Sequence, residues 1–104
     1  MADGKLVRDL IPQIIRESGA EPKVYIASLE EYRERLHHKL SEEVAEFLTA
    51  DDSAAAEELA DILEVVYALA LDLGMAPSRL EERRAQKAAS RGGFAGKIVW
   101  TGNA

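Results

Sequence analysis

Residues 29–73, LEEYRERLHHKLSEEVAEFLTADDSAAAEELADILEVVYALALDL, decide the fold of this chain. Apolar residues recur at spacings of three and four through the first half of the stretch, which is the pattern of an amphipathic helix. Ser28 and Glu31 have the spacing of a capping box, so we expect this helix to run from there to about residue 50. Asp51 can cap a second helix, over about residues 54–73, which Gly74 would end.

Shorter elements flank this pair of helices. Proline at 12 and glycine at 19 bracket a short helix over residues 12–18, because proline suits a first turn and glycine the position just past the end. Ser78 and Glu81 form a second capping box, which predicts a last helix that stops at the glycine pair 92–93. Strand-favouring residues near Val24 and near Val99 predict two short accessory strands that could pair with each other.

Length and composition favour one small soluble domain over residues 1–104. The 104 residues are 47% apolar and 31% charged, and they include no cysteine, which excludes disulfides and thiolate zinc sites. The 19 acidic residues outnumber the 13 Lys and Arg, which argues against a nucleic-acid polymer as partner. No stretch approaches the roughly 20 apolar residues of a membrane span, so we expect a cytoplasmic protein without a membrane partner.

The second long helix carries a pattern that favours self-association. Residues 54–73 are apolar over most of a helical circumference. A helix of this kind is usually buried on every side, and a monomer of this length has little material to cover it. We therefore expect an all-α helical bundle that is completed by oligomerisation, as a homo-oligomer that is a dimer or a tetramer.

Acidic residues interrupt both apolar patterns at matching places. At about 100° per residue, Glu43 falls within roughly 20° of the centre of the first helix's apolar stripe, with Glu46 one turn further on. Glu58 and Asp61 have the same spacing on the second helix. Since a short connection makes helices pack antiparallel, the two pairs would face each other. Carboxylates gathered in this way favour Mg²⁺ or Mn²⁺, although solvated stripes paired with lysines are the alternative.

The ordered set of motifs resembles a known family. Glu43-x-x-Glu46, followed after eleven residues by Glu58-x-x-Asp61, is similar to the metal-binding signature of the MazG-like, all-α nucleoside triphosphate pyrophosphohydrolases. Related enzymes are phosphoribosyl-ATP pyrophosphohydrolase and dimeric dUTPase. Further blocks that resemble a small MazG-like branch are KLVRDLIP at 5–12, KLSEE at 39–43, ADILEV at 60–65 and KAASRGGF at 87–94.

The resemblance implies Mg²⁺-dependent hydrolysis of a nucleoside triphosphate to the monophosphate and pyrophosphate. It makes four carboxylates the metal ligands: Glu43, Glu46, Glu58 and Asp61. Either Glu42 or Glu64 would orient the attacking water or support the metal from an outer shell, and the sequence does not choose between them.

Basic residues are needed to hold the phosphates of such a substrate. Arg8 and Lys39 lie in the matching blocks, and three more bases share one face of the last helix: Arg84, Lys87 and Arg91. The alternative for these three is a solvated basic face that pairs with Glu81 and Glu82.

Two further functions stay open at this point. Within the same enzyme class, the substrate could be phosphoribosyl-ATP. From another class, the chain could be a non-catalytic helical oligomerisation or binding module in which the acidic residues pair with bases across an interface.

Overall fold

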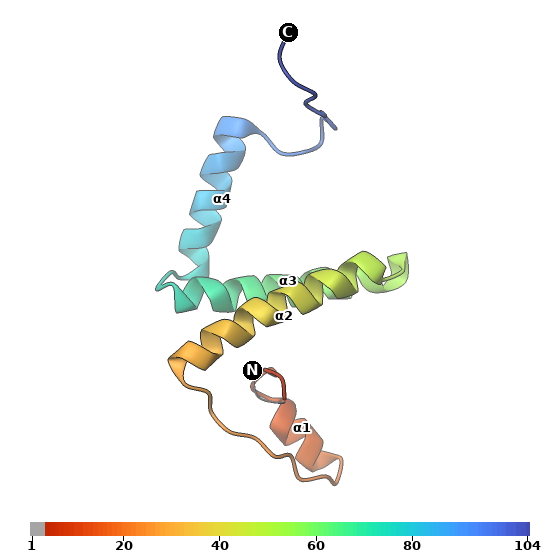
Figure 1. Ribbon diagram of the computed structural model, residues 1–104, viewed down its shortest axis with the longest axis vertical. Helices are drawn as coiled ribbons and strands as arrows, with labels where there is room; N and C mark the ends of the chain where they lie inside the picture. The colour runs from red at the N-terminus through yellow and green to blue at the C-terminus, as the bar shows by residue number, and fades with distance from the viewer. Residues whose placement is uncertain (1–3) are drawn as a thin grey trace.

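The computed structural model describes residues 4–104, which fold into helices joined by irregular segments (Figure 1). Residues 1–3, which the single-domain prediction includes, lie outside the described part of the chain. The elements are α1 (Ile11–Glu17), α2 (Leu29–Thr49), α3 (Asp52–Asp72) and α4 (Pro77–Arg91). The predicted all-α class is confirmed, and none of the helices in residues 4–104 has the length and apolar character to cross a bilayer.

Helices α2 and α3 form an antiparallel hairpin at the centre of the molecule (Figure 1). The predicted cap of α2 is confirmed, since the Ser28 hydroxyl accepts a hydrogen bond from the Glu31 amide at 3.2 Å. The connection is as short as expected, because Asp51 caps α3 by accepting from the Ala54 amide at 3.0 Å. These two caps satisfy amides that would otherwise lack a partner at the helix ends, and they fix where the hairpin turns.

The hairpin buries only a small core within one chain. Its buried apolar side chains are Leu36, Val65 and Ala70. Two charged residues, Arg35 and Glu43, are also buried, and each is only 6% exposed. Since burial of a charge is costly unless it is compensated, both residues need an account in terms of their partners.

The ends of the shorter helices differ slightly from the sequence prediction. Helix α4 begins at Pro77 and its first residues have no side-chain cap, so the capping box predicted at Ser78 is wrong. Pro77 takes the first helical position, which its fixed φ suits, so Ser78 lies inside the first turn and not at the cap. At the other end, Gly92 takes φ +81° and ends the helix as predicted.

The accessory strands predicted near Val24 and Val99 are wrong, because residues 4–104 contain no strand. Figure 1 shows why the two segments do not pair. The segment between α1 and α2 lies on one side of the hairpin, whereas the C-terminal tail lies beyond the far end of α4. Strand-favouring side chains do not make a strand without a neighbouring backbone to accept and donate the hydrogen bonds.

The single chain is far from compact. Its radius of gyration is 17.9 Å, and its extents are 62 × 34 × 25 Å, whereas a compact domain of about 100 residues has a radius near 13 Å. The accessible surface is 8848 Å², against about 5,800 Å² for a compact monomer of this size. Helix α4 projects from the hairpin and contacts it only near the end of α3 (Figure 1). Much apolar surface is therefore left uncovered.

Candidate functional site

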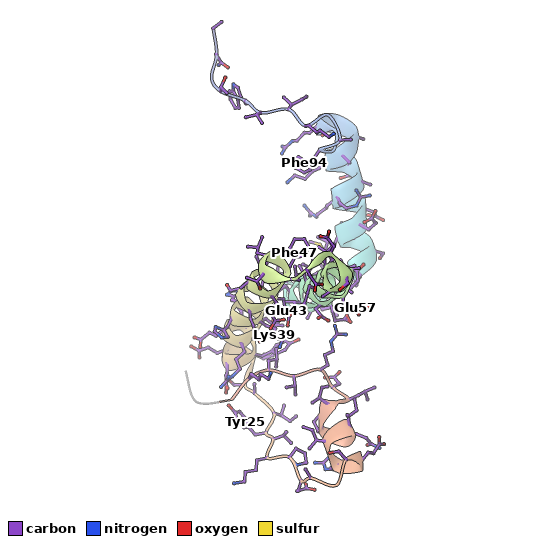
Figure 2. All side chains as sticks on the ribbon, turned by 90° about the vertical axis from the view of Figure 1, so that its right-hand side faces the viewer. Tyr25, Lys39, Glu43, Phe47, Glu57 and Phe94 are labelled. Carbon is purple, nitrogen blue, oxygen red and sulfur yellow. The ribbon has the colours of Figure 1, made fainter. Side chains whose placement is uncertain are left out.

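Glu43 lies at the centre of a cluster of carboxylates between α2 and α3. The residue as a whole is only 6% exposed, which confirms its predicted place on the buried face of α2. Figure 2 shows Glu43 and Lys39 on α2 close to α3. Glu43 belongs to two groups of three carboxylates whose oxygens lie within 4.8 Å of one another, one with Glu42 and Glu46 and the other with Glu58 and Asp61.

Two oxygens at the core of this cluster have no hydrogen-bond partner. Among residues 4–104, Glu43 Oε2 and Glu58 Oε2 are buried and accept nothing. A buried carboxylate oxygen without a donor costs the desolvation free energy of a charged group. Oxygens from both helices that converge on a shared space match the all-oxygen coordination of Mg²⁺ or Mn²⁺. The donor set therefore fits a divalent cation.

The electrostatics of Glu43 reflect its neighbours. Burial raises the pKa of Glu43 above its ordinary value, and the charge of Glu46 raises this pKa further. Lys39 opposes the shift, with its Nζ 3.4 Å from Glu43 Oε1 and 3.9 Å from Glu42 Oε2. One lysine does not offset several close carboxylates, so the cluster keeps an excess of negative charge.

Arg8 reaches the same cluster from the N-terminal segment. Its Nη2 donates a hydrogen bond to Asp61 Oδ1 at 2.7 Å, and the two residues are 53 positions apart in the sequence. Asp61 is thus both a member of the carboxylate group and one half of an ion pair. The motif block at residues 5–12 is brought beside the acidic pair of α3.

The two candidates for orienting water differ in position. Glu42 is half-buried and belongs to the cluster with Glu43 and Glu46. Glu64 is exposed and belongs to neither carboxylate group in residues 4–104. The geometry therefore favours Glu42 for a role beside the metal ligands.

The bases of α4 lie apart from the carboxylates within one chain. Arg84, Lys87 and Arg91 are exposed on the projecting helix, whose far end Figure 2 marks by Phe94. Arg84 Nη2 lies 2.6 Å from Glu81 Oε1, which is the pairing that the solvated-face alternative expects. A role for these three residues in phosphate binding stays a prediction.

Sequence reasoning missed Arg35, the buried base of α2. Its Nε donates to Glu31 Oε2 at 2.7 Å, and its Nη1 donates to the Gly4 carbonyl at 2.9 Å. The Tyr25 hydroxyl also donates to Glu31, and this bond, together with Arg35, lowers the pKa of Glu31. The i, i+4 spacing of Glu31 and Arg35 was a visible signal, but the contact with Gly4 depends on the folded path of the N-terminal segment.

A family model matches most of the chain. A model of the MazG-like family matches residues 26–94, which include the whole carboxylate cluster. An uncharacterized protein of Mycolicibacterium smegmatis (strain ATCC 700084 / mc(2)155) is 50% identical over 54 residues, or 52% of this chain. The match spans 55% of that relative's own length. No solved structure matches the chain.

Proposed function

The chain belongs to the MazG-like family, and from that premise we propose that it hydrolyses a nucleoside triphosphate to the monophosphate and pyrophosphate with Mg²⁺ as cofactor. The family supports a pyrophosphohydrolase activity in general. The observation that carries the proposal for this chain is the buried Glu43, which belongs to both carboxylate groups and whose Oε2 has no hydrogen-bond donor. Coordination of a divalent cation would compensate for the burial of this oxygen.

The residues of the carboxylate cluster would have different roles according to their positions. Glu43, Glu46, Glu58 and Asp61 would hold divalent cations, with Mn²⁺ as a possible replacement for Mg²⁺. Bound cations of this kind neutralise phosphate charge and lower the pKa of water. We assign to Glu42, the half-buried neighbour, the role of accepting a proton from water or orienting it.

Lys39 and Arg8 supply positive charge next to the carboxylates. Lys39 Nζ lies within 4 Å of Glu42 and Glu43, and the Arg8 guanidinium contacts Asp61. A planar guanidinium binds phosphate oxygens in a bidentate manner, while the lysine acts as a point charge. We therefore propose that both residues hold the phosphates of the substrate, which is the role that the sequence analysis expects of them.

A direct assay tests the proposed reaction. Purified protein, incubated with Mg²⁺ and a panel of standard and modified nucleoside triphosphates, should release pyrophosphate from at least one of them. Asp61→Asn is the matched negative control, because it removes a ligand charge at nearly constant volume. Absence of release across the panel, with no metal binding by calorimetry, would refute the proposal. Inclusion of phosphoribosyl-ATP tests the runner-up, since preferred turnover of that compound would identify it as the substrate.

The ion pairs around the carboxylates support the alternative that the chain is a non-catalytic helical module. Arg8 with Asp61 and Lys39 with Glu43 could serve a helical module that has no reaction to perform. Thermal melts separate the two cases. A metal site raises the melting temperature in proportion to the logarithm of Mg²⁺ concentration, whereas an ion-paired module responds only to ionic strength.

A substitution on α4 tests whether its basic face binds phosphate. Lys87→Ala should raise KM for the triphosphate by about tenfold, the order expected for one lost charge-assisted hydrogen bond, with a smaller change in kcat. Arg79→Ala is the matched control, because Arg79 lies on the same helix and pairs with Glu82 at 3.7 Å. Steady-state kinetics are the measurement, and an unchanged kcat/KM would assign Lys87 to the solvated surface.

We further propose a homo-oligomer, dimer or tetramer, as the active form. The support is the open shape of the single chain and its large accessible surface. Several large apolar side chains of α2 and α3 are exposed, which a protein normally avoids unless a partner covers them.

A further inference from the structure

The N-terminal segment is tied across the hairpin at two points. Arg35, which is buried in α2, donates to the Gly4 carbonyl, and Arg8 pairs with Asp61 on α3. Just after Arg8 the chain enters α1, where the Ile11 amide donates to the Arg8 carbonyl at 3.1 Å. The backbone on both sides of Arg8 is therefore held, and the guanidinium is presented to the cluster by a fixed path.

Within the group formed by Glu43, Glu58 and Asp61, Arg8 pairs with Asp61, whose side chain is more exposed than that of Glu43. Asp61 has a 40% exposed side chain, whereas the Glu43 side chain in the same group is only 8% exposed. The oxygens without donors belong to the inner residues, Glu43 and Glu58. Asp61 and its guanidinium partner are thus more open to solvent than the donor-less oxygen of Glu43.

The ion pair between Arg8 and Asp61 is well formed, but it can be broken at little cost in stability. Its 2.7 Å distance is that of a well-formed charge-assisted bond, yet the Arg8 side chain is 56% exposed. An exposed ion pair contributes little net stability, and the side chain can turn into water without disturbing the core. A divalent ion brings two charges to a site where the guanidinium brings one.

From this geometry we infer that Arg8 is the resident counter-ion of Asp61, which a divalent cation must displace. In the metal-free chain the guanidinium reduces repulsion within the cluster. When a cation takes Asp61, Arg8 is released but stays beside the site, where a triphosphate can bind it. Metal binding would thus free the guanidinium of Arg8 to bind phosphate, so the metal would bind before the triphosphate. This inference rests on the proposed metal site.

Calorimetric titration of Mn²⁺ and Mg²⁺ into the metal-free full-length protein tests the displacement. Arg8→Ala should tighten the metal dissociation constant by about two- to fivefold, which is the range an exposed ion pair can supply. Arg8→Gln should do the same with most of the side-chain stem kept. In the wild-type protein, the Arg8 Nε–H resonance should change on titration with Mg²⁺, while that of Arg33 stays constant.

Two matched controls isolate the effect. Lys5→Ala removes one positive charge from the same segment, at a residue that forms no ion pair with the described carboxylates. Arg33→Ala removes a second arginine–aspartate bridge, which joins Arg33 Nε on α2 to Asp72 Oδ2 on α3 at 2.8 Å. Both variants should leave the metal dissociation constant unchanged, because neither residue occupies Asp61.

The outcomes separate this inference from the function it rests on. Metal binding by the wild-type protein with unchanged or weaker affinity in both Arg8 variants overturns the displacement and leaves the metal site standing. Equal tightening in Arg8→Ala and Lys5→Ala also overturns it, since a general charge effect would explain both. No metal binding by the wild-type protein overturns the proposed metal site and this inference with it.

Discussion

Glu43→Gln should abolish metal binding and lower turnover by at least about 100-fold, while the metal-free variant becomes more stable than the wild-type protein. Loss of activity follows because Glu43 is shared by both carboxylate groups. Even residues that only support metal ligands cost about 10- to 100-fold when they are changed, so a direct ligand should cost no less. The gain in stability follows because the amide removes a buried charge that repels its neighbours.

The pH dependence gives this prediction its sign. The folded protein raises the pKa of Glu43, mainly through burial, so the folded state binds the proton more tightly than the unfolded chain does. Glu43 therefore destabilises the fold increasingly as pH rises from its ordinary pKa of 4.5 through the raised value. Glu43→Gln should therefore gain stability progressively across that window, up to a gain on the order of 1 kcal/mol at neutral pH.

Thermal melts of metal-free protein at pH 4 and pH 7, with calorimetry for Mg²⁺, measure both effects. Glu34→Gln is the matched control, since Glu34 is an exposed residue of the same helix. That control should keep metal binding, turnover and melting temperature. Full metal affinity in Glu43→Gln would remove Glu43 from the ligand set. A lower melting temperature at pH 7 would mean that its ion pair with Lys39 outweighs the cost of burial.

The sequence predicted the hairpin and the centre of its site because both depend on local rules. Helical periodicity placed Glu43 on a buried face, and Ser28 fixed the start of α2 through a side-chain bond within four residues. The short connection then brought Glu58 and Asp61 opposite Glu43 without any knowledge of the rest of the chain.

What the sequence did not predict depends on contacts between distant segments. The pairing of Arg8 with Asp61 and the bond from Arg35 to Gly4 join residues 53 and 31 positions apart, and no periodicity encodes them. The strand predictions near Val24 and Val99 failed because strand formation also depends on a contact with a distant segment, and in residues 4–104 that contact is absent. Their local propensity was right for strands, but the fold of one chain gives them no partner backbone.

We expect the protein to self-associate through the exposed apolar residues of α3. Four apolar residues at a spacing of four lie along one stripe of this helix and stay 36–61% exposed: Leu59, Leu63, Tyr67 and Leu71. A continuous stripe of this length on a helix is the pattern of a helix-packing face. Sedimentation velocity or light scattering of the wild-type protein should therefore give the mass of a dimer or tetramer.

Leu63→Asp should disrupt that assembly. Leu63 lies in the middle of the stripe, and a carboxylate desolvated there without a partner costs several kcal/mol per copy. The dissociation constant should rise by more than about 100-fold, with a fall in sedimentation coefficient and a loss of helicity by circular dichroism, since the single chain buries so little. Gln13→Asp, an equally charged change at an exposed polar residue of α1, should leave the mass unchanged. A wild-type protein that sediments as a folded monomer at micromolar concentration would contradict the prediction whatever the variant does, because the exposed stripe would then be stable in water without a partner.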